Sequence, residues 1–189
     1  WPQALCVDFD TSFLDIPPEV LIASMQQHQK CFAVYSKDNQ LLPHFVAVSN
    51  IESSSPKHVV QGNERVMHAR LSDGAFFYSE DKKRTLVSRV EHTEQVVFQA
   101  DLGSLRDKTK RMTALIAHLA PFVEVEVDIA SRAAELSKSD LSTGMVGEFP
   151  ELQGIMGYYY ALHDNEPQDI AIAMKEQYLP RYSKDSLPE

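Results

Sequence analysis

Three basic side chains within six residues form one group that could bind an anion. Arg65 and His68 are three residues apart in the string NERVMHARLSD, so on a helix they would share one face, with Arg70 close by. Guanidinium groups bind phosphates and carboxylates through paired hydrogen bonds, so this face could hold either anion. The alternative is a solvated helix face whose cations pair with Glu64 and Asp73 of the same helix.

A second basic group follows Ser104 and consists of Arg106, Lys108, Lys110 and Arg111. Ser104 is a good helix cap, which would place these cations in the first two turns of a helix. Cations there oppose the helix dipole, which favours negative charge at a helix N-terminus. Either an anionic partner meets this end of the helix, or Asp101 and Asp107 neutralise it locally.

His163 and Asp164 form a dyad of the kind found in metal-dependent phosphohydrolases. Such sites need a further histidine upstream and an aspartate downstream to complete the set of metal ligands. The helical part of the chain offers His118 and Asp169 for these roles, and turn residues directly after the dyad place it at a helix end. The ligand set is therefore incomplete, and we assign no metal ligand.

Two further groups favour structural roles over chemistry. Glu148 and Glu151 could act as a general acid and base, but Glu151 falls in the first turn of a helix opened by Pro150, which favours capping. The consecutive tyrosines 158–160 would point in different directions on a helix, which favours packing over a platform for stacking bases. We assign no catalytic residue.

The composition is that of a globular cytoplasmic protein. The chain has 189 residues, 43% of them hydrophobic, and no apolar run reaches the roughly 18 residues that a membrane span needs. Cys6 and Cys31 make no CxxC pair and lie near apolar residues, as expected for thiols in a reducing compartment. The net charge of -9 argues against nucleic-acid binding over the whole surface but leaves room for a local basic surface. A start at Trp1 without Met suggests a piece of a longer protein.

Strand and helix patterns alternate in the first half of the chain. We expect an extended segment over 1–15, a helix over 18–29, a hairpin of strands 31–35 and 41–49, and helices over 56–81 and 84–98. The second strand of the hairpin is apolar on both faces, which predicts a central position in a small sheet.

The second half of the chain is predicted to be all helical. Four of the seven glycines fall between Lys138 and Tyr160, which indicates close backbone approach between two short helices over 139–148 and 150–162. Further helices are expected over 125–136 and 168–178. The predicted fold class is α+β, with a mixed unit over 1–103 that combines a small antiparallel sheet with long helices. A helical domain over 104–189, cut short at its C-terminal end, follows a boundary near Gly103.

Five strings, in chain order, resemble the bacterial glycyl-tRNA synthetase beta subunit family. They are HQKCFAVY ending at Tyr35, FVAVSNIES ending at Ser53, GNERVMHARLSDGAFFYSED ending at Asp81, LGSLRDKTKR ending at Arg111, and EFPELQGIMGYYYA. The resemblance covers most of the chain and corresponds to an internal part of that subunit. It also implies that the helical domain is a degenerate relative of the HD superfamily.

The resemblance implies a role in an ATP-dependent glycine-tRNA ligase, a class II aminoacyl-tRNA synthetase. ATP and Mg would act on the alpha subunit, while this part of the beta subunit, catalytically inactive and without a cofactor of its own, would help bind and position tRNA(Gly). The whole enzyme would be a tetramer of two alpha and two beta subunits. The residues expected to contact tRNA or the other subunit are Arg65, Arg70, Arg106, Lys108, Lys110 and Arg111. The alternatives are a metal-dependent phosphohydrolase of the HD type and a purely structural module for subunit interaction.

Overall fold

The computed structural model describes residues 2–123 and 125–188, and they form two compact units that divide between Ser79 and Glu80. Trp1, the first residue of the expected extended segment, lies outside the described residues. The boundary expected near Gly103 falls inside the second unit. The second unit begins earlier because the last residues of the long helix pack with the helical part of the chain, as described below.

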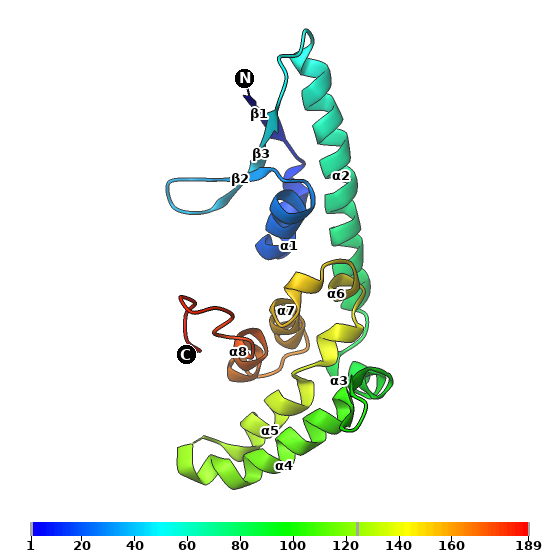
Figure 1. Ribbon diagram of the computed structural model, residues 1–189, viewed down its shortest axis with the longest axis vertical. Helices are drawn as coiled ribbons and strands as arrows, with labels where there is room; N and C mark the ends of the chain where they lie inside the picture. The colour runs from blue at the N-terminus through cyan, green and yellow to red at the C-terminus, as the bar shows by residue number, and fades with distance from the viewer. Residues whose placement is uncertain (1, 124, 189) are drawn as a thin grey trace. The chain divides into compact units, whose positions relative to one another are not determined.

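The first unit consists of a three-stranded sheet and helices (Figure 1). Its elements are β1 (Gln3–Asp8), a 3-10 helix (Thr11–Asp15), α1 (Pro18–Ile22), a π-helical stretch (Ala23–His28), β2 (Phe32–Tyr35), β3 (Leu41–Ser49) and α2 (Pro56–Asp81), the last continuing into the second unit. The predicted helix over 18–29 is therefore present, but its second half widens into π-helix.

The sheet has the strand order β1-β3-β2 and is antiparallel throughout. The prediction that β3 is central is confirmed. Val7 lies opposite Phe45, and both are fully buried, so this face of the sheet supports the core of the unit. Further core residues come from α1, the π-helical stretch and α2, and are Val20, Leu21, Met25, Met67 and Leu71.

α2 is one continuous helix over the range that the apolar pattern predicts. Pro56 suits its first turn because proline lacks an N–H that the helix would use there. Gly74 permits close approach to α1, since a Cβ at this position would lie 3.0 Å from Cγ1 of Val20. Glycine usually weakens a helix interior, but at Gly74 its small size allows this packing contact.

The second unit is mostly helical, as predicted (Figure 1). Its regular elements are α3 (Leu86–Arg89), β4 (Val97–Gln99), β5 (Gly103–Ser104), α4 (Leu105–Val123), α5 (Val127–Leu136), α6 (Gly144–Glu148), α7 (Ile155–His163) and α8 (Gln168–Glu176). α4 packs against α5, and α8 packs against both α5 and α7.

The single helix expected over 84–98 is wrong in its second half. α3 ends at Arg89, a 3-10 helix follows over Val90–Gln95, and β4 pairs with β5 in a small hairpin. β-Branched and aromatic residues at 96–98 favour this extended conformation. Gly103 has φ of +83°, a conformation that favours glycine, and β5 begins there.

The two helices expected over 139–162 are four shorter ones. They are a 3-10 helix (Ser139–Ser142), α6, a second 3-10 helix (Pro150–Leu152) and α7. Gly154 separates the last two with φ of +83°. A Cβ at this position would lie 2.9 Å from the carbonyl oxygen of Met174 in α8. The predicted close approach between backbones is confirmed here.

Candidate nucleic-acid interface

A capping box forms the N-terminus of α4. The Ser104 N–H and hydroxyl both donate to Oδ2 of Asp107 at 2.9 Å, and the Asp107 N–H donates to the Ser104 hydroxyl at 3.2 Å. The bonds from the Ser104 backbone and hydroxyl hold the pKa of Asp107 below its usual value, with Lys110 and Arg111 adding to the effect. The N-terminus of α4 thus carries the negative charge of Asp107, as expected from the alternative in which Asp101 and Asp107 neutralise the cations locally.

Two of the four cations of α4 form ion pairs within the unit. Arg106 lies 3.7 Å from Glu135 on α5, and Lys110 lies 3.8 Å from Glu94. Both partners of the Lys110 pair are more than half exposed, so that pair is weak in water. Arg106 is less exposed and helps hold α4 against α5.

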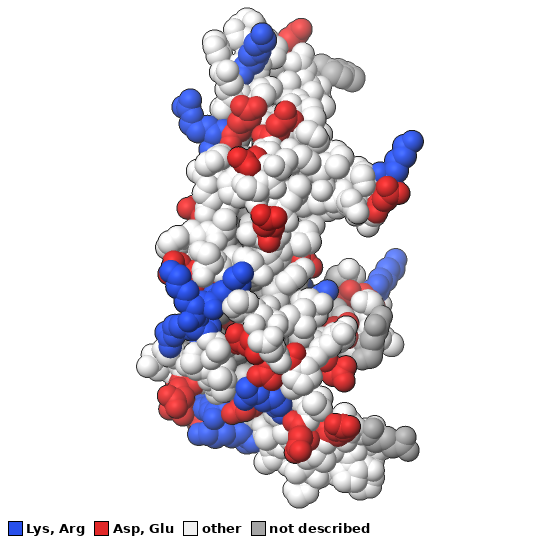
Figure 2. Space-filling view, turned by 180° about the vertical axis from the view of Figure 1, so that it is seen from behind, with Lys and Arg blue, Asp and Glu red and all other residues white. Residues whose placement is uncertain are grey.

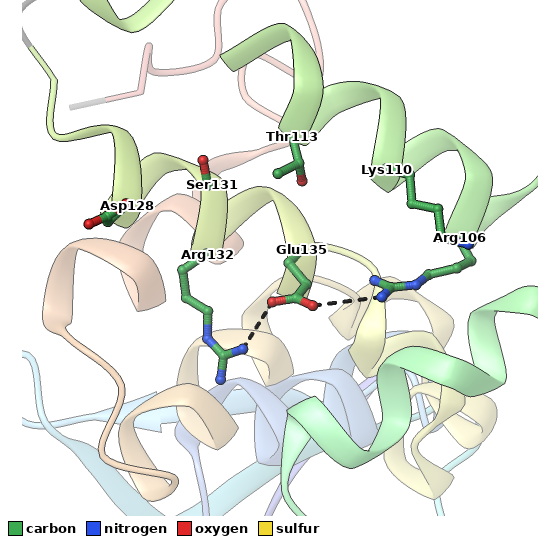
Figure 3. A pocket seen from close by; sticks show the side chains of 7 residues that line it. All are labelled: Arg106, Lys110, Thr113, Asp128, Ser131, Arg132 and Glu135. Atoms are coloured by element: carbon green, nitrogen blue, oxygen red, sulfur yellow. Dashed lines mark hydrogen bonds and ion pairs between the residues drawn. The ribbon is translucent and has the colours of Figure 1, made fainter. Parts of the chain in front are cut away.

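A pocket of about 460 Å³ lies between α4 and α5 (Figure 3). Its lining residues are Arg106, Lys110, Thr113, Asp128, Ser131, Arg132 and Glu135. Glu135 lies between two arginines, at 3.0 Å from Arg132 and 3.7 Å from Arg106 (Figure 3). Arg132 also binds Glu166 at 2.5 Å, and this hydrogen bond is the main cause that raises the pKa of the arginine. Charges within the pocket are therefore largely balanced.

Lys108 and Arg111 are the cations of α4 that form no ion pair with a described residue. They lie three residues apart, so they share a face of the helix. The Lys108 ammonium lies 4.3 Å above the ring of Phe98, and Arg111 is exposed. Burial, followed by the charge of Lys108, lowers the pKa of Lys138 to about 8. Lys108 is therefore close enough to Lys138 for the two positive charges to repel each other.

Basic and acidic side chains are interspersed over the face that Figure 2 shows. The basic side chains gather in clusters with acidic side chains beside them, so that face carries both signs of charge. An anionic partner would therefore be met by a few positioned cations, and its binding would depend on their local geometry.

The basic group on α2 behaves differently. Arg65 and His68 both line a pocket of the first unit, but so do Asp8, Asp10 and Glu64, and Arg70 does not line it. The His68 ring packs edge-on against Phe13 with 5.4 Å between ring centroids. The structure thus brings Arg65 and His68 together beside three carboxylates, which is a poor setting for a phosphate.

Asp81, the last residue of α2, is a buried hub that the sequence does not reveal. Its carboxylate accepts hydrogen bonds from the N–H groups of Gly144 (2.9 Å) and Met145 (2.8 Å), the Tyr160 hydroxyl (3.1 Å) and Arg89 (3.2 Å). Arg89 is itself only 6% exposed. These bonds join the end of α2 to α3, α6 and α7, and no local spacing signals pairs so distant in sequence.

Asp140 is a second buried carboxylate. Its Oδ2 accepts from the N–H of Gly154 at 2.6 Å and that of Gly157 at 3.2 Å, while Oδ1 has no hydrogen-bond partner among the described residues. Burial raises the pKa of Asp140 to about 6, against the opposing effects of these bonds and of Lys138. This hub holds the start of α7.

The carboxylate of Asp164 caps a helix. Its Oδ2 accepts from the N–H of Leu86 at 2.6 Å, at the first residue of α3. His118 and His163 are both exposed, on α4 and at the end of α7. Over residues 2–123 and 125–188, no group of three or more His, Cys, Asp or Glu is arranged to hold a metal ion. The likeness to the HD superfamily remains a prediction.

Within the part of the chain that the structure describes, no helix combines the length and the apolar character needed to cross a membrane.

Comparison with known proteins places the whole chain in one family. The family profile described as "Glycyl-tRNA synthetase beta subunit" matches residues 1–189. A glycine-tRNA ligase beta subunit of Pseudomonas putida is 49% identical over 189 residues, and those of Coxiella burnetii and Hahella chejuensis are 51% identical over 188. The match covers 100% of this chain but only 27–28% of each relative. The chain belongs to the glycyl-tRNA synthetase beta subunit family.

Proposed function

We propose that this chain is part of the beta subunit of a cytoplasmic glycine-tRNA ligase and helps bind and position tRNA(Gly). The observation that carries the proposal is the pair Lys108 and Arg111 on one face of α4, neither of which is paired with a described carboxylate. Asp107 is occupied by the capping box, and Arg106 is occupied by Glu135. The remaining cations of the helix are therefore available for phosphate groups.

The chemistry of the reaction is assigned to the alpha subunit, with ATP and Mg bound there. A beta subunit implies an alpha partner. In this proposal two alpha and two beta subunits form a class II enzyme, and residues 1–189 contribute no catalytic group. The buried carboxylates support this division of labour, because Asp81 and Asp140 are engaged in holding backbone N–H groups.

The decisive experiment reverses both charges, as Lys108→Glu with Arg111→Glu, in the complete enzyme. Each lost phosphate contact reduces the slope of log K against log salt by about one, so the double variant should lose about two. Binding of tRNA(Gly), followed by fluorescence anisotropy, should weaken at least tenfold at low salt. A matched control is Lys37→Glu with Lys57→Glu, which makes the same charge change at exposed sites of the first unit.

A kinetic measurement separates tRNA positioning from glycine activation. The double variant should raise KM for tRNA(Gly), whereas glycine-dependent exchange of pyrophosphate into ATP should remain unchanged. If it binds tRNA like the control variant, α4 is not the tRNA contact. If pyrophosphate exchange fails as well, the substitutions act on the assembly of the two subunits, which is the purely structural alternative.

A further inference from the structure

The sheet of the first unit has an apolar face exposed to solvent. Side chains alternate along β3, so Phe45 and Ala47 point into the core while Val46 and Val48 point away from it. A solvated face of an antiparallel sheet usually carries polar residues at the outward positions. Here Val48 is 47% exposed and the next outward position, Val46, is also apolar.

The neighbouring strands extend this apolar face. Cys6 and Phe32 lie opposite Val46 from the two sides, and Ala4 lies opposite Val48. Phe32 is 59% exposed, and Ala4 and Cys6 are exposed.

The polar residues at one end of the face are paired with each other. Asp8 lies opposite His44, and Nδ1 of the histidine is 2.7 Å from Oδ1 of the aspartate. The interior of the face is left with apolar side chains only. Contiguous apolar surface of this kind marks a contact with another structural element.

We infer that an amphipathic helix of the same subunit, from outside residues 1–189, covers the face formed by Ala4, Cys6, Phe32, Val46 and Val48. This rests on the proposal that the chain is part of a longer beta subunit. The curated relatives are more than three times as long, since this chain spans only 27–28% of them. A segment of the same polypeptide meets the face at an effective concentration that can reach the order of mM, without a separate partner.

The dimensions of the face fit one helix. Three strands spaced about 4.8 Å apart place the two outer strands about 10 Å from each other. A helix with its side chains is about 10–12 Å in diameter, so a single apolar stripe would span β1, β3 and β2 together.

Cys6 provides a direct probe of this cover. Its thiol lies on the open face, whereas Cys31 is buried and its thiol donates to the carbonyl oxygen of Gln29 at 3.5 Å. The complete beta subunit, without its alpha partner, is treated with N-ethylmaleimide, and both sites are followed by peptide mass spectrometry. Cys6 should react at least tenfold more slowly than in the same protein unfolded by denaturant.

A variant pair tests whether the apolar contact is the cause. Val48→Lys places a charge under the covering helix and should raise the labelling rate of Cys6 severalfold towards the unfolded rate. Gln40→Lys adds the same side chain at an exposed turn between β2 and β3 and should change nothing. Protection of Cys31 in both variants shows that the sheet is still folded.

Three outcomes would overturn the inference. Cys6 that reacts at the unfolded rate in the complete subunit means that the face is open. Protection that appears only after the alpha subunit is added, or that disappears on dilution, assigns the face to that subunit or to a second copy. None of these results bears on tRNA binding by Lys108 and Arg111, so the two proposals can fail separately.

Discussion

Loss of the carboxylate at Asp81 should destabilise the second unit more than other single charge removals on α2. The substitution Asp81→Ala leaves Arg89 buried and without its ionic partner, and leaves the N–H groups of Gly144 and Met145 without an acceptor. The Tyr160 hydroxyl loses the same acceptor. All these groups are held in one place by a single side chain.

The expected magnitude follows from the burial of these groups. Breaking a buried ion pair by removing one partner costs about 3–5 kcal/mol, because the other charge stays buried. Each buried N–H left without an acceptor costs about 1–3 kcal/mol, but relaxation around the cavity makes these costs less than additive. We expect a loss of about 4 kcal/mol in the free energy of opening of the second unit.

Amide hydrogen exchange is the suitable assay, because global unfolding of a chain with two units need not be two-state. A loss of about 4 kcal/mol corresponds to a fall of roughly 1,000-fold in the protection of amides that exchange through opening of this unit. The N–H groups of Gly144 and Met145 should lose the most protection against exchange. The control is Asp73→Ala, an exposed charge on the same helix, for which a change within about 0.5 kcal/mol is expected.

The pairing itself is tested by a double-mutant cycle. Asp81→Asn removes the negative charge that pairs with Arg89, while Arg89→Met removes the buried positive charge itself. In the Arg89→Met background, Asp81→Asn should therefore cost clearly less than in the wild type. The reasoning is refuted if the amides of the Asp81→Ala variant are protected as well as those of the Asp73→Ala variant. It is also refuted if the free-energy costs of Asp81→Asn and Arg89→Met simply add.

Two further predictions concern the second buried carboxylate and its glycines. Burial raises the pKa of Asp140 from 3.8 to about 6, so the folded protein keeps a proton that the unfolded chain loses, and stability should fall as pH rises from about 4 to about 6. The free energy of unfolding should fall by on the order of 3 kcal/mol over this range, and urea unfolding repeated across pH should show a much smaller fall for Asp140→Asn. The same dependence on pH in the wild type and the variant would contradict this. Gly157→Ala places a methyl 2.8 Å from Cε of Met174 and 3.2 Å from Oδ2 of Asp140, and should cost about 1–3 kcal/mol. Gly147→Ala meets nothing within 4 Å and should be neutral or stabilise by up to about 1 kcal/mol, so equal effects at the two glycines would show that crowding is not the cause.

The sequence predicts elements well where local pattern and tertiary packing agree. α2 spans the predicted range because its apolar face and its opening proline act in the same direction. Apolar residues on both faces of β3 predict its central position correctly, although one face of the strand is open to solvent within residues 1–189. The pattern reports that a side chain is suited to burial without reporting what buries it.

Prediction fails where distant contacts decide the local conformation. The helix expected over 84–98 ends early because Val97 pairs with Ser104 across a turn. The region 139–162 divides because Asp140 binds the N–H groups of Gly154 and Gly157. A carboxylate that captures backbone groups fourteen and seventeen residues away has no signature in helical periodicity.

The candidate site was predictable only in part. The basic group after Ser104 is visible in the sequence, but its division into paired and unpaired cations is not. Arg106 is paired because Glu135 lies on the neighbouring helix, whereas Lys108 and Arg111 form no ion pair with a described residue. The packing of α4 against α5 and against the 3-10 helix over Val90–Gln95 makes that distinction.

Two of the five strings that carry the family resemblance coincide with contacts of the buried carboxylates. One ends at Asp81, and another contains Gly154, Gly157 and Tyr160, which bind the two buried carboxylates. In this chain these contacts hold α6 and α7 in place.

Resemblance in such strings therefore identifies the scaffold and says little about what the scaffold binds. LGSLRDKTKR differs, because its first residues close the capping box while Lys108 and Arg111, later in the string, form no ion pair with a described residue. The charge of Lys108, which is held over the Phe98 ring, adds to the effect of burial in lowering the pKa of Lys138, so the two ammonium groups repel each other. An anionic partner at α4 would offset that repulsion, so a test of the proposed tRNA contact should begin there.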